Sequence, residues 1–242
     1  MTETAAETQT SAASPGLLAR VVGIIFSPRE TYTAVAARPR WLGMMVITLV
    51  VGAAAQYVVL SSPELQENII DQQIRAMQER GAASDQQIAS VETMIQRLPM
   101  LYTAAAFIIG PVITAVIAGL LMVVFTMLMG GNGTFRQLFA IVTHAGVISV
   151  LAGLFSAALV WAGVPPTGVQ PPSASLGVFV PMLEETSFTA IFLGTINLIL
   201  VWWLLSLAIG LGVLYRRRTG PIATALISVY VIIALIVAFV RS

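Results

Sequence analysis

The chain has 242 residues, of which 57% are hydrophobic and only 10% are charged, and its mean hydropathy is +0.90. This composition excludes an ordinary soluble domain and predicts an integral membrane protein. The formal net charge is +1, every basic side chain other than His144 is arginine, and there is no cysteine. Disulfide scaffolds, thiolate nucleophiles and cysteine-based metal sites are therefore excluded.

The N-terminal 40 residues precede the first long apolar run. Residues 1–15 have the polar, small-residue composition of a disordered tail and lack the pattern of a signal peptide. In residues 16–26 apolar side chains recur at helical spacing over a stretch too short to cross a bilayer, which predicts an interfacial amphipathic helix. A second such helix is predicted to begin at Ser27, with Pro28 at its first position and Glu30 closing a capping box, and to end near Arg38 before Pro39.

Five apolar runs follow, each near or above the roughly 20 residues that a membrane-spanning helix needs. They predict an all-α fold, an integral membrane five-helix bundle with spans at residues 41–60, 102–129, 138–161, 189–215 and 221–240. Trp41, Tyr57, Tyr102, Trp161 and Tyr215 fall near the ends of these spans, as interfacial aromatic residues do.

The distribution of arginine predicts the orientation, because positive charge concentrates on the cytoplasmic side. If the N-terminus is cytoplasmic, the inner segments hold Arg20, Arg29, Arg38, Arg40, Arg136, Arg216, Arg217 and Arg218, and the outer segments hold Arg75, Arg80, Arg97 and Arg241. Three adjacent guanidiniums are costly in hydrocarbon, so the 216–218 turn must lie at a membrane surface. We therefore expect a cytoplasmic N-terminus and an outer C-terminus.

Two long segments are predicted to lie outside. Residues 61–100 carry two apolar helical patterns separated at Gly81 to Ser84, which predicts a helical hairpin whose apolar stripe packs on itself, on the membrane or on another copy. Residues 162–188 are rich in proline and should be irregular, with an apolar stretch at 176–180 able to enter the interface and Glu184 and Glu185 starting the next helix.

Candidates for chemistry within the spans are few. No Asp, Glu, Lys or interior Arg lies in any predicted span, and neither HExxH nor GxSxG occurs, which argues against an enzyme, a metal site or a bound cofactor. Gln56, His144 and Asn197 could line a polar pathway, but such residues more often hydrogen-bond neighbouring helices. Gly110-Pro111 predicts a kink, and Ala145, Ser149, Gly153 and Ala157 form a ladder of small residues that suggests close helix packing.

The glycine-rich segment before the third span, Gly130 to Thr134, looks superficially like a phosphate loop. It lacks the GK[ST] ending and precedes a membrane helix instead of following a strand. A tight cytoplasmic turn with Thr134 as the N-cap of the next helix is the better prediction.

Three stretches together resemble the Yip-one (Ypt/Rab-interacting protein) domain family, in its bacterial branch. They are Ser27 to Tyr32 leading through Arg38-Pro39-Arg40-Trp41, Gly133 to Ala140, and Trp202 to Gly212 followed by a basic turn. The resemblance covers roughly residues 20–240 and implies a five-span domain, here residues 41–242, with a cytoplasmic N-terminus. Eukaryotic members act in membrane traffic with Rab-type GTPases. This chain has only a short N-terminal segment and no Asp-Leu-Tyr-Gly-Pro motif, which argues against a GTPase partner.

The sequence favours a non-catalytic multi-pass protein of a bacterial inner membrane that organises the membrane or recruits partners. Anionic lipids, protein partners and a second copy are the candidate partners, and nucleic acid is not. The candidate lipid or partner face is formed by Arg29, Arg38, Arg40, Arg136, Arg216, Arg217 and Arg218. The same arginines could instead serve only to set the topology. The alternative function is a transporter or channel for a small neutral or lipidic substrate.

Overall fold

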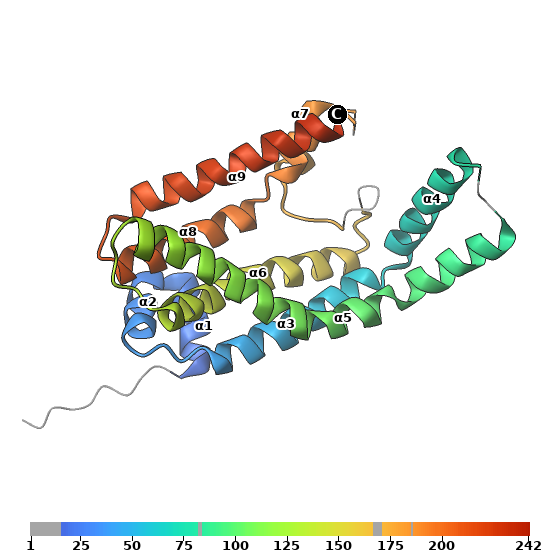
Figure 1. The fold of residues 1–242 in the computed structure, drawn as a ribbon. Coiled ribbons are helices and arrows are strands. Elements are labelled where there is room, and N and C mark those ends of the chain that lie inside the picture. Colours follow the sequence, from blue (N-terminus) through green and yellow to red (C-terminus); the bar gives the residue numbers. More distant parts are fainter. Residues whose placement is uncertain (1–15, 82–83, 167–170, 185) are drawn as a thin grey trace, which may run out of the picture.

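In the computed structural model the described residues are 16–81, 84–166, 171–184 and 186–242, and they form a helical bundle (Figure 1). The predicted tail at residues 1–15 lies outside this range. The elements are α1 (Leu17–Phe26), α2 (Pro28–Ala37), α3 (Leu42–Leu60), α4 (Pro63–Glu79), α5 (Asp85–Met122), the π-helical turn η1 (Val123–Leu128), α6 (Phe135–Trp161), the 3-10 turn η2 (Leu176–Phe179), α7 (Phe188–Thr195), α8 (Leu198–Leu214) and α9 (Thr219–Arg241).

Four helical segments of the described chain are long and apolar enough to cross a membrane. They are α3, the continuous α5–η1 segment, α6 and α9. The remaining predicted span, residues 189–215, is divided into α7 and α8 by extended backbone at Ile196 and Asn197. The hydropathy of this segment is high throughout and does not predict the division. The division depends instead on tertiary hydrogen bonds at the joint.

The core of the bundle lies around the first half of α6, where almost every residue from Leu138 to Ile148 is buried. α3 runs parallel to α6 in close contact, since Gly52 faces Val150 and a Cβ on Gly153 would lie 3.5 Å from the Cβ of Ala55. Of the predicted small-residue ladder, Ala145 and Gly153 lie in packed positions but Ser149 is exposed. α5 and α8 also pack against α6.

α1 and α2 pack into one end of this bundle through Ile24, Tyr32 and Val35, which are buried. α2 ends at Ala37, close to the predicted position. The predicted capping box is wrong, because the Ser27 side chain makes no cap hydrogen bond. Ser27 ends α1 and begins α2, and its carbonyl instead accepts hydrogen bonds from the amide and the hydroxyl of Thr31.

At the opposite end α4 packs along the outer part of α5, and the two form a hairpin that projects beyond the other helices (Figure 1). Ser84 caps α5 with a complete capping box, as Thr134 does for α6. α5 continues through Pro99 and Pro111 as one helix. α7 begins with Ser187 as its N-cap, so the prediction that Glu184 and Glu185 start the helix is wrong for Glu184, and Glu185 lies outside the described residues.

Candidate functional site: the arginine end

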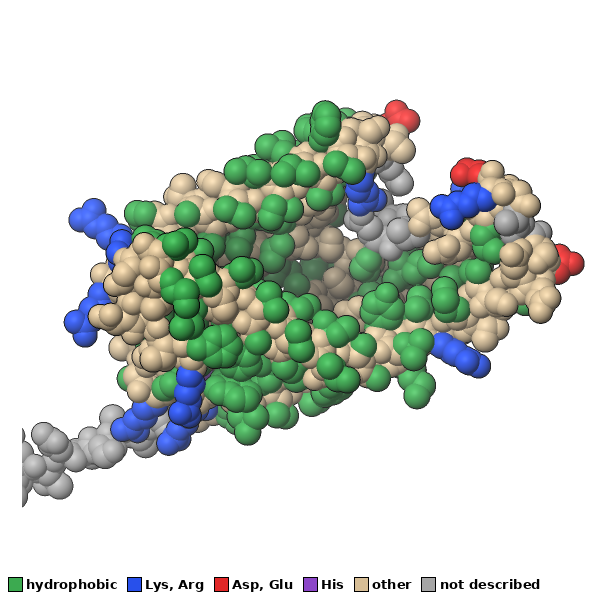
Figure 2. All heavy atoms as spheres, viewed as in Figure 1, with side chains coloured by type: hydrophobic (Ala, Val, Ile, Leu, Met, Phe, Trp, Pro, Cys, Tyr) green, Lys and Arg blue, Asp and Glu red, His purple; other side chains and the backbone are tan. Residues whose placement is uncertain are grey.

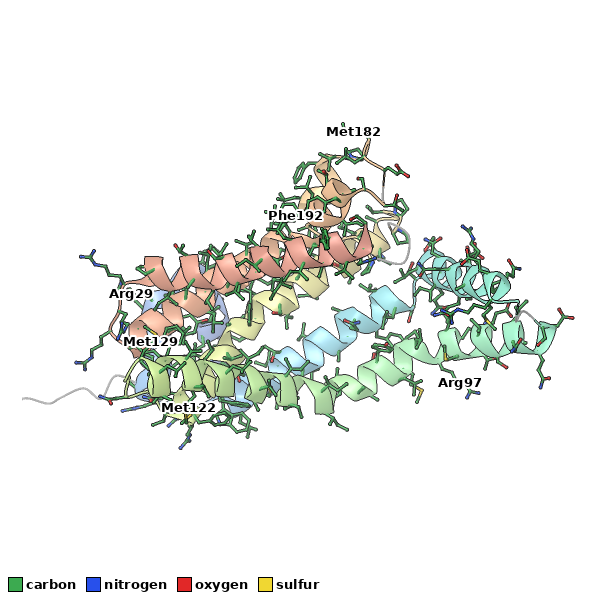
Figure 3. All side chains as sticks on the ribbon, turned by 45° about the horizontal axis from the view of Figure 1, so that its top comes forward. Arg29, Arg97, Met122, Met129, Met182 and Phe192 are labelled. Carbon is green, nitrogen blue, oxygen red and sulfur yellow. The ribbon has the colours of Figure 1, made fainter. Side chains whose placement is uncertain are left out.

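Exposed arginines gather at the end of the bundle that α1 and α2 close, which we call the arginine end (Figure 2). They come from three separate parts of the chain: the ends of α2 and the link to α3, the first turn of α6, and the turn between α8 and α9. They are the seven residues of the predicted face, Arg29, Arg38, Arg40, Arg136, Arg216, Arg217 and Arg218. Figure 3 places Arg29 at this end and Arg97 on α5 toward the hairpin.

Tyr215 fixes the turn that carries Arg216 to Arg218. Its hydroxyl lies 2.8 Å from Oγ1 of Thr126 in η1, and its ring stacks on Phe125 with centroids 5.3 Å apart. Glycine is required opposite this ring, because a Cβ on Gly131 or Gly133 would lie within 2.6 Å of Tyr215 atoms. The predicted glycine-rich turn therefore accommodates the Tyr215 ring against Gly131 and Gly133, and we call this arrangement the Tyr215 socket. Thr126 also donates to the carbonyl of Gly133 at 3.2 Å.

Tyr32 attaches α2 to α8. The side chain is fully buried, its hydroxyl lies 2.8 Å from Oγ of Ser206, and a Cβ on Gly210 would lie 3.1 Å from its ring. Burial raises the pKa of Tyr32 well above its usual value, although the Ser206 hydrogen bond opposes the shift, so Tyr32 stays neutral. Gln137 donates to the carbonyl of Ala36 at 2.9 Å and ties the end of α2 to α6.

His144 is fully buried on α6 and contacts Arg20 of α1. Its Nδ1 lies 2.7 Å from the carbonyl of Ala140, so Nδ1 carries the proton and donates. Nε2 is then an acceptor for Nη1 of Arg20 at 3.4 Å, and the same Nη1 donates to the carbonyl of Arg40 at 3.0 Å. His144 is thus a neutral acceptor that orients a guanidinium.

Asn197 holds the joint between α7 and α8. Its Oδ1 accepts from the amides of Ile199 at 2.9 Å and Leu200 at 3.2 Å, which makes it the N-cap of α8. Tyr230 of α9 completes the joint, since its hydroxyl accepts from the Asn197 amide at 2.9 Å and donates to the carbonyl of Thr195 at 2.6 Å. The segment at Ser175 pairs with the joint as an antiparallel bridge.

The predicted polar residues do not form one site. Gln56 is exposed on α3, His144 contacts Arg20 at the arginine end, and Asn197 caps α8. The described residues contain no cluster of three or more His, Cys, Asp or Glu side chains suited to a metal ion.

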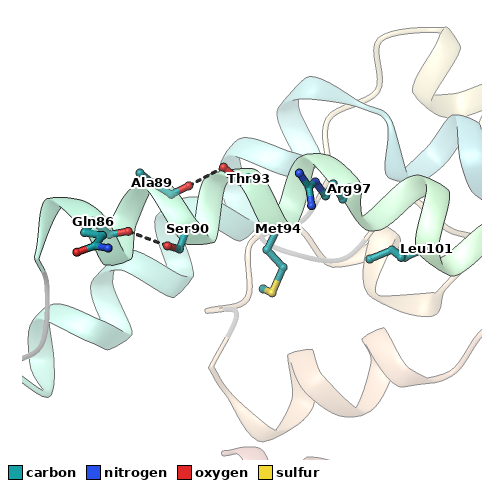
Figure 4. Close-up of a pocket in the computed structure, with 7 residues that line it drawn as sticks. All are labelled: Gln86, Ala89, Ser90, Thr93, Met94, Arg97 and Leu101. Carbon is teal, nitrogen blue, oxygen red and sulfur yellow. Dashed lines mark hydrogen bonds between the residues drawn. The ribbon is translucent and has the colours of Figure 1, made fainter.

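An open depression of about 540 Å³ lies on the outer part of α5 (Figure 4). Its lining comes from one face of that helix: Gln86, Ala89, Ser90, Thr93, Met94, Arg97 and Leu101. The hydrogen bonds drawn there are local, from Ser90 to the carbonyl of Gln86 and from Thr93 to that of Ala89. The depression therefore has no set of polar groups converging from different elements.

Four apolar helical segments of spanning length in the described part of the chain define a multi-pass helical membrane protein. Comparison with known families then gives the particular family: the chain matches the Yip1 domain over residues 22–241 and belongs to the Yip1 family. No curated protein and no solved structure matches the chain.

Sequence reasoning missed the tyrosines that organise these contacts. Tyr32 and Tyr230 lie within helices, away from the span ends where interfacial aromatic residues are expected. Tyr230 lies in an apolar helix, and there a tyrosine carries a signal, because a buried hydroxyl needs a partner; Tyr32 lies in a polar helix and gives no such signal. That signal identifies the residue and does not identify the partner.

Proposed function

We propose that this protein is a non-catalytic, multi-pass protein of a bacterial inner membrane that gathers anionic lipids or protein partners at its arginine end. The observation that carries the proposal is the convergence of seven exposed arginines from three parts of the chain. Residues 16–41, 129–138 and 215–220 contain a single carboxylate, that of Glu30. Near anionic head groups each basic residue contributes roughly 1 kcal/mol.

The rigidity of the arginine end supports a binding role. Tyr215 in its glycine socket precedes the arginine triplet directly, and Tyr32 and Gln137 anchor α2 between Arg29 and Arg38. A surface held by buried contacts loses less conformational entropy on binding than a mobile loop does.

The test compares two triple variants of the full-length protein. We expect R216Q/R217Q/R218Q to lower retention of phosphatidylglycerol by at least about tenfold, since three charges are lost from one surface. The matched control, R75Q/R80Q/R97Q, removes the same charge from the hairpin and should have little effect. Retained lipid is counted by native mass spectrometry. Equal retention in the two variants would show that the triplet only sets topology.

Topology is the second part of the proposal. We infer five crossings, with α7 and α8 acting together as one. α8 alone is about 26 Å long at 1.5 Å per residue, which falls short of a hydrocarbon core of about 30 Å, and α7 supplies the remainder. Five crossings and the positive-inside rule give a cytoplasmic N-terminus and an outer C-terminus. An alkaline phosphatase fusion after Ser242 should be active and one within the 216–218 turn inactive, and the reverse pattern would contradict this topology.

The placement of α1 belongs to the same proposal. Leu18, Val22 and Phe26 lie at four-residue spacing and are 77%, 54% and 79% exposed. This outward apolar stripe suits a helix that lies in the membrane interface. α1 would then bring the link to α3, with Arg38 and Arg40, close to the lipid head groups.

A transporter or channel is the second candidate, favoured by one observation. The α7–α8 joint is a discontinuous helix, a feature that many transporters use at their substrate sites. In this reading Asn197 and His144 would contribute to a path for a small neutral or lipidic substrate. Unchanged flux in proteoliposomes carrying N197L or H144L would exclude it.

A further inference from the structure

Arg20 directs its side chain into the bundle, unlike the seven exposed arginines. Its Nη1 donates to two neutral acceptors, the carbonyl of Arg40 and Nε2 of His144. Its Nε–H is buried without a hydrogen-bond partner, and no described carboxylate forms an ion pair with this guanidinium. A half-buried cation without a described anionic partner is costly, so this position favours an anion from outside the described chain.

Arg40 brings a second positive charge close to Arg20, since the backbone carbonyl of Arg40 accepts from Nη1 of Arg20 at 3.0 Å. Desolvation by burial and repulsion from Arg40 both lower the pKa of Arg20 from its ordinary value. Two neighbouring guanidiniums are well suited to phosphate, because each can offer parallel N–H donors to its oxygens. The chemistry at the start of α3 therefore fits a phosphate group.

The adjoining surface indicates the source of that phosphate. Trp41 follows Arg40 directly and packs edge-on against Phe139 with centroids 4.9 Å apart, and tryptophan is enriched where head groups begin. Leu42, Val46 and Val50 follow on one face of α3 and are 64%, 53% and 51% exposed. Since α3 is a helix of spanning length, this face is available to acyl chains.

We propose that Arg20 and Arg40 bind the phosphate of one phospholipid, whose acyl chains lie along the Leu42–Val50 face of α3. The lipid belongs to the leaflet at the arginine end. This inference rests on the proposed function, since it assigns a defined lipid site to that end. His144 acts here as a positioning residue, because it orients Arg20 and does not face the lipid.

The experiment measures, by native mass spectrometry of the full-length protein, the affinity of the most tightly held phosphatidylglycerol. R20Q and R40Q should each weaken it roughly fivefold, which corresponds to about 1 kcal/mol per arginine. R136Q, which removes an exposed charge from the same end, is the matched control and should change it less than twofold. Because Arg40 is exposed, R40Q tests the site even if R20Q fails to fold.

The outcomes separate this site from the wider proposal. If R216Q/R217Q/R218Q releases lipid while R20Q and R40Q hold it as tightly as R136Q does, the arginine end binds lipid but this site is wrong. If none of these variants changes retention, both proposals fail. Displacement of the lipid by excess inorganic phosphate would show that the site takes free phosphate, which would also overturn the lipid assignment.

Discussion

The arginine end and the hairpin of α4 with the first part of α5 are both helical, but they differ in how side chains from distant parts of the chain are used. At the arginine end, Tyr32 meets Ser206 and Arg20 meets His144 across separate helices. In the hairpin, Leu65 and Ile95 are buried between two adjacent helices. The described ion pair there, Arg75 with Asp71 at 4.0 Å, is exposed and lies on one helix.

The arginine end is therefore part of the packed bundle, whereas the hairpin is a peripheral element. Exposed surface ion pairs contribute little to stability, whereas buried contacts between helices cannot be lost without leaving cavities or unpaired polar groups. Substitutions of the buried contacts at the arginine end should therefore affect the whole bundle, and those in the hairpin should have local effects.

The largest effect is expected at Gly210, which separates Tyr32 from Ile141. A Cβ there would lie 2.5 Å from Cγ2 of Ile141 and 3.1 Å from the ring of Tyr32, both in the core. We expect G210V to lower the free energy of unfolding by about 2–4 kcal/mol through overpacking. Thermal unfolding in detergent measures this. G119V is the control, since nothing lies within 4 Å of that position, and equal losses would contradict the argument.

The next effect is at the α7–α8 joint. Y230F removes a hydroxyl that pairs both the Asn197 amide and the Thr195 carbonyl. Leaving these backbone groups unpaired should cost about 1–3 kcal/mol. Hydrogen exchange of residues 195–198 should accelerate more than exchange in α6. Y57F, at an exposed tyrosine, is the control, and unchanged exchange at the joint in Y230F would mean that Tyr230 does not hold it.

A smaller effect is expected at the socket of Tyr215. Y215F keeps the stacking on Phe125 and removes the hydrogen bond with Thr126. One partly buried hydrogen bond is worth about 0.5–1.5 kcal/mol, so the bundle should remain folded. The turn should loosen, and a cysteine placed at Arg217 in this cysteine-free chain should react faster with a maleimide. No change in labelling rate would argue against the socket.

The smallest effect is in the hairpin. Hydrogen bonds from the backbone and from the Ser62 hydroxyl lower the pKa of Glu64 at the start of α4. A carboxylate whose pKa is lowered on folding stabilises the fold above its unfolded pKa, and this contribution disappears as the pH falls through the folded pKa. E64Q should therefore lose part of the acid sensitivity of α4, measured by circular dichroism melts at neutral and acidic pH. E67Q is the control.

Much of the fold could be predicted because hydropathy and capping are local properties. Four predicted spans correspond to helices of spanning length, and Thr134 and Ser84 cap helices as their sequences indicate. The exposure of the seven candidate arginines could also be predicted, because charge in an apolar chain has to remain near water, while their binding role stays a prediction. The division of residues 189–215 could not, since it depends on Tyr230 and on the segment at Ser175.

By itself, the sequence determined the membrane class, the helical content and the positions where charge can reside, because each follows from the cost of placing polar groups in hydrocarbon. Only the tertiary structure decided which polar groups meet. Tyr32 and Ser206 are 174 positions apart, and Arg20 and His144 are 124 apart. No sequence periodicity relates residues that are so far apart in the chain. They meet because the helices that carry them pack against one another.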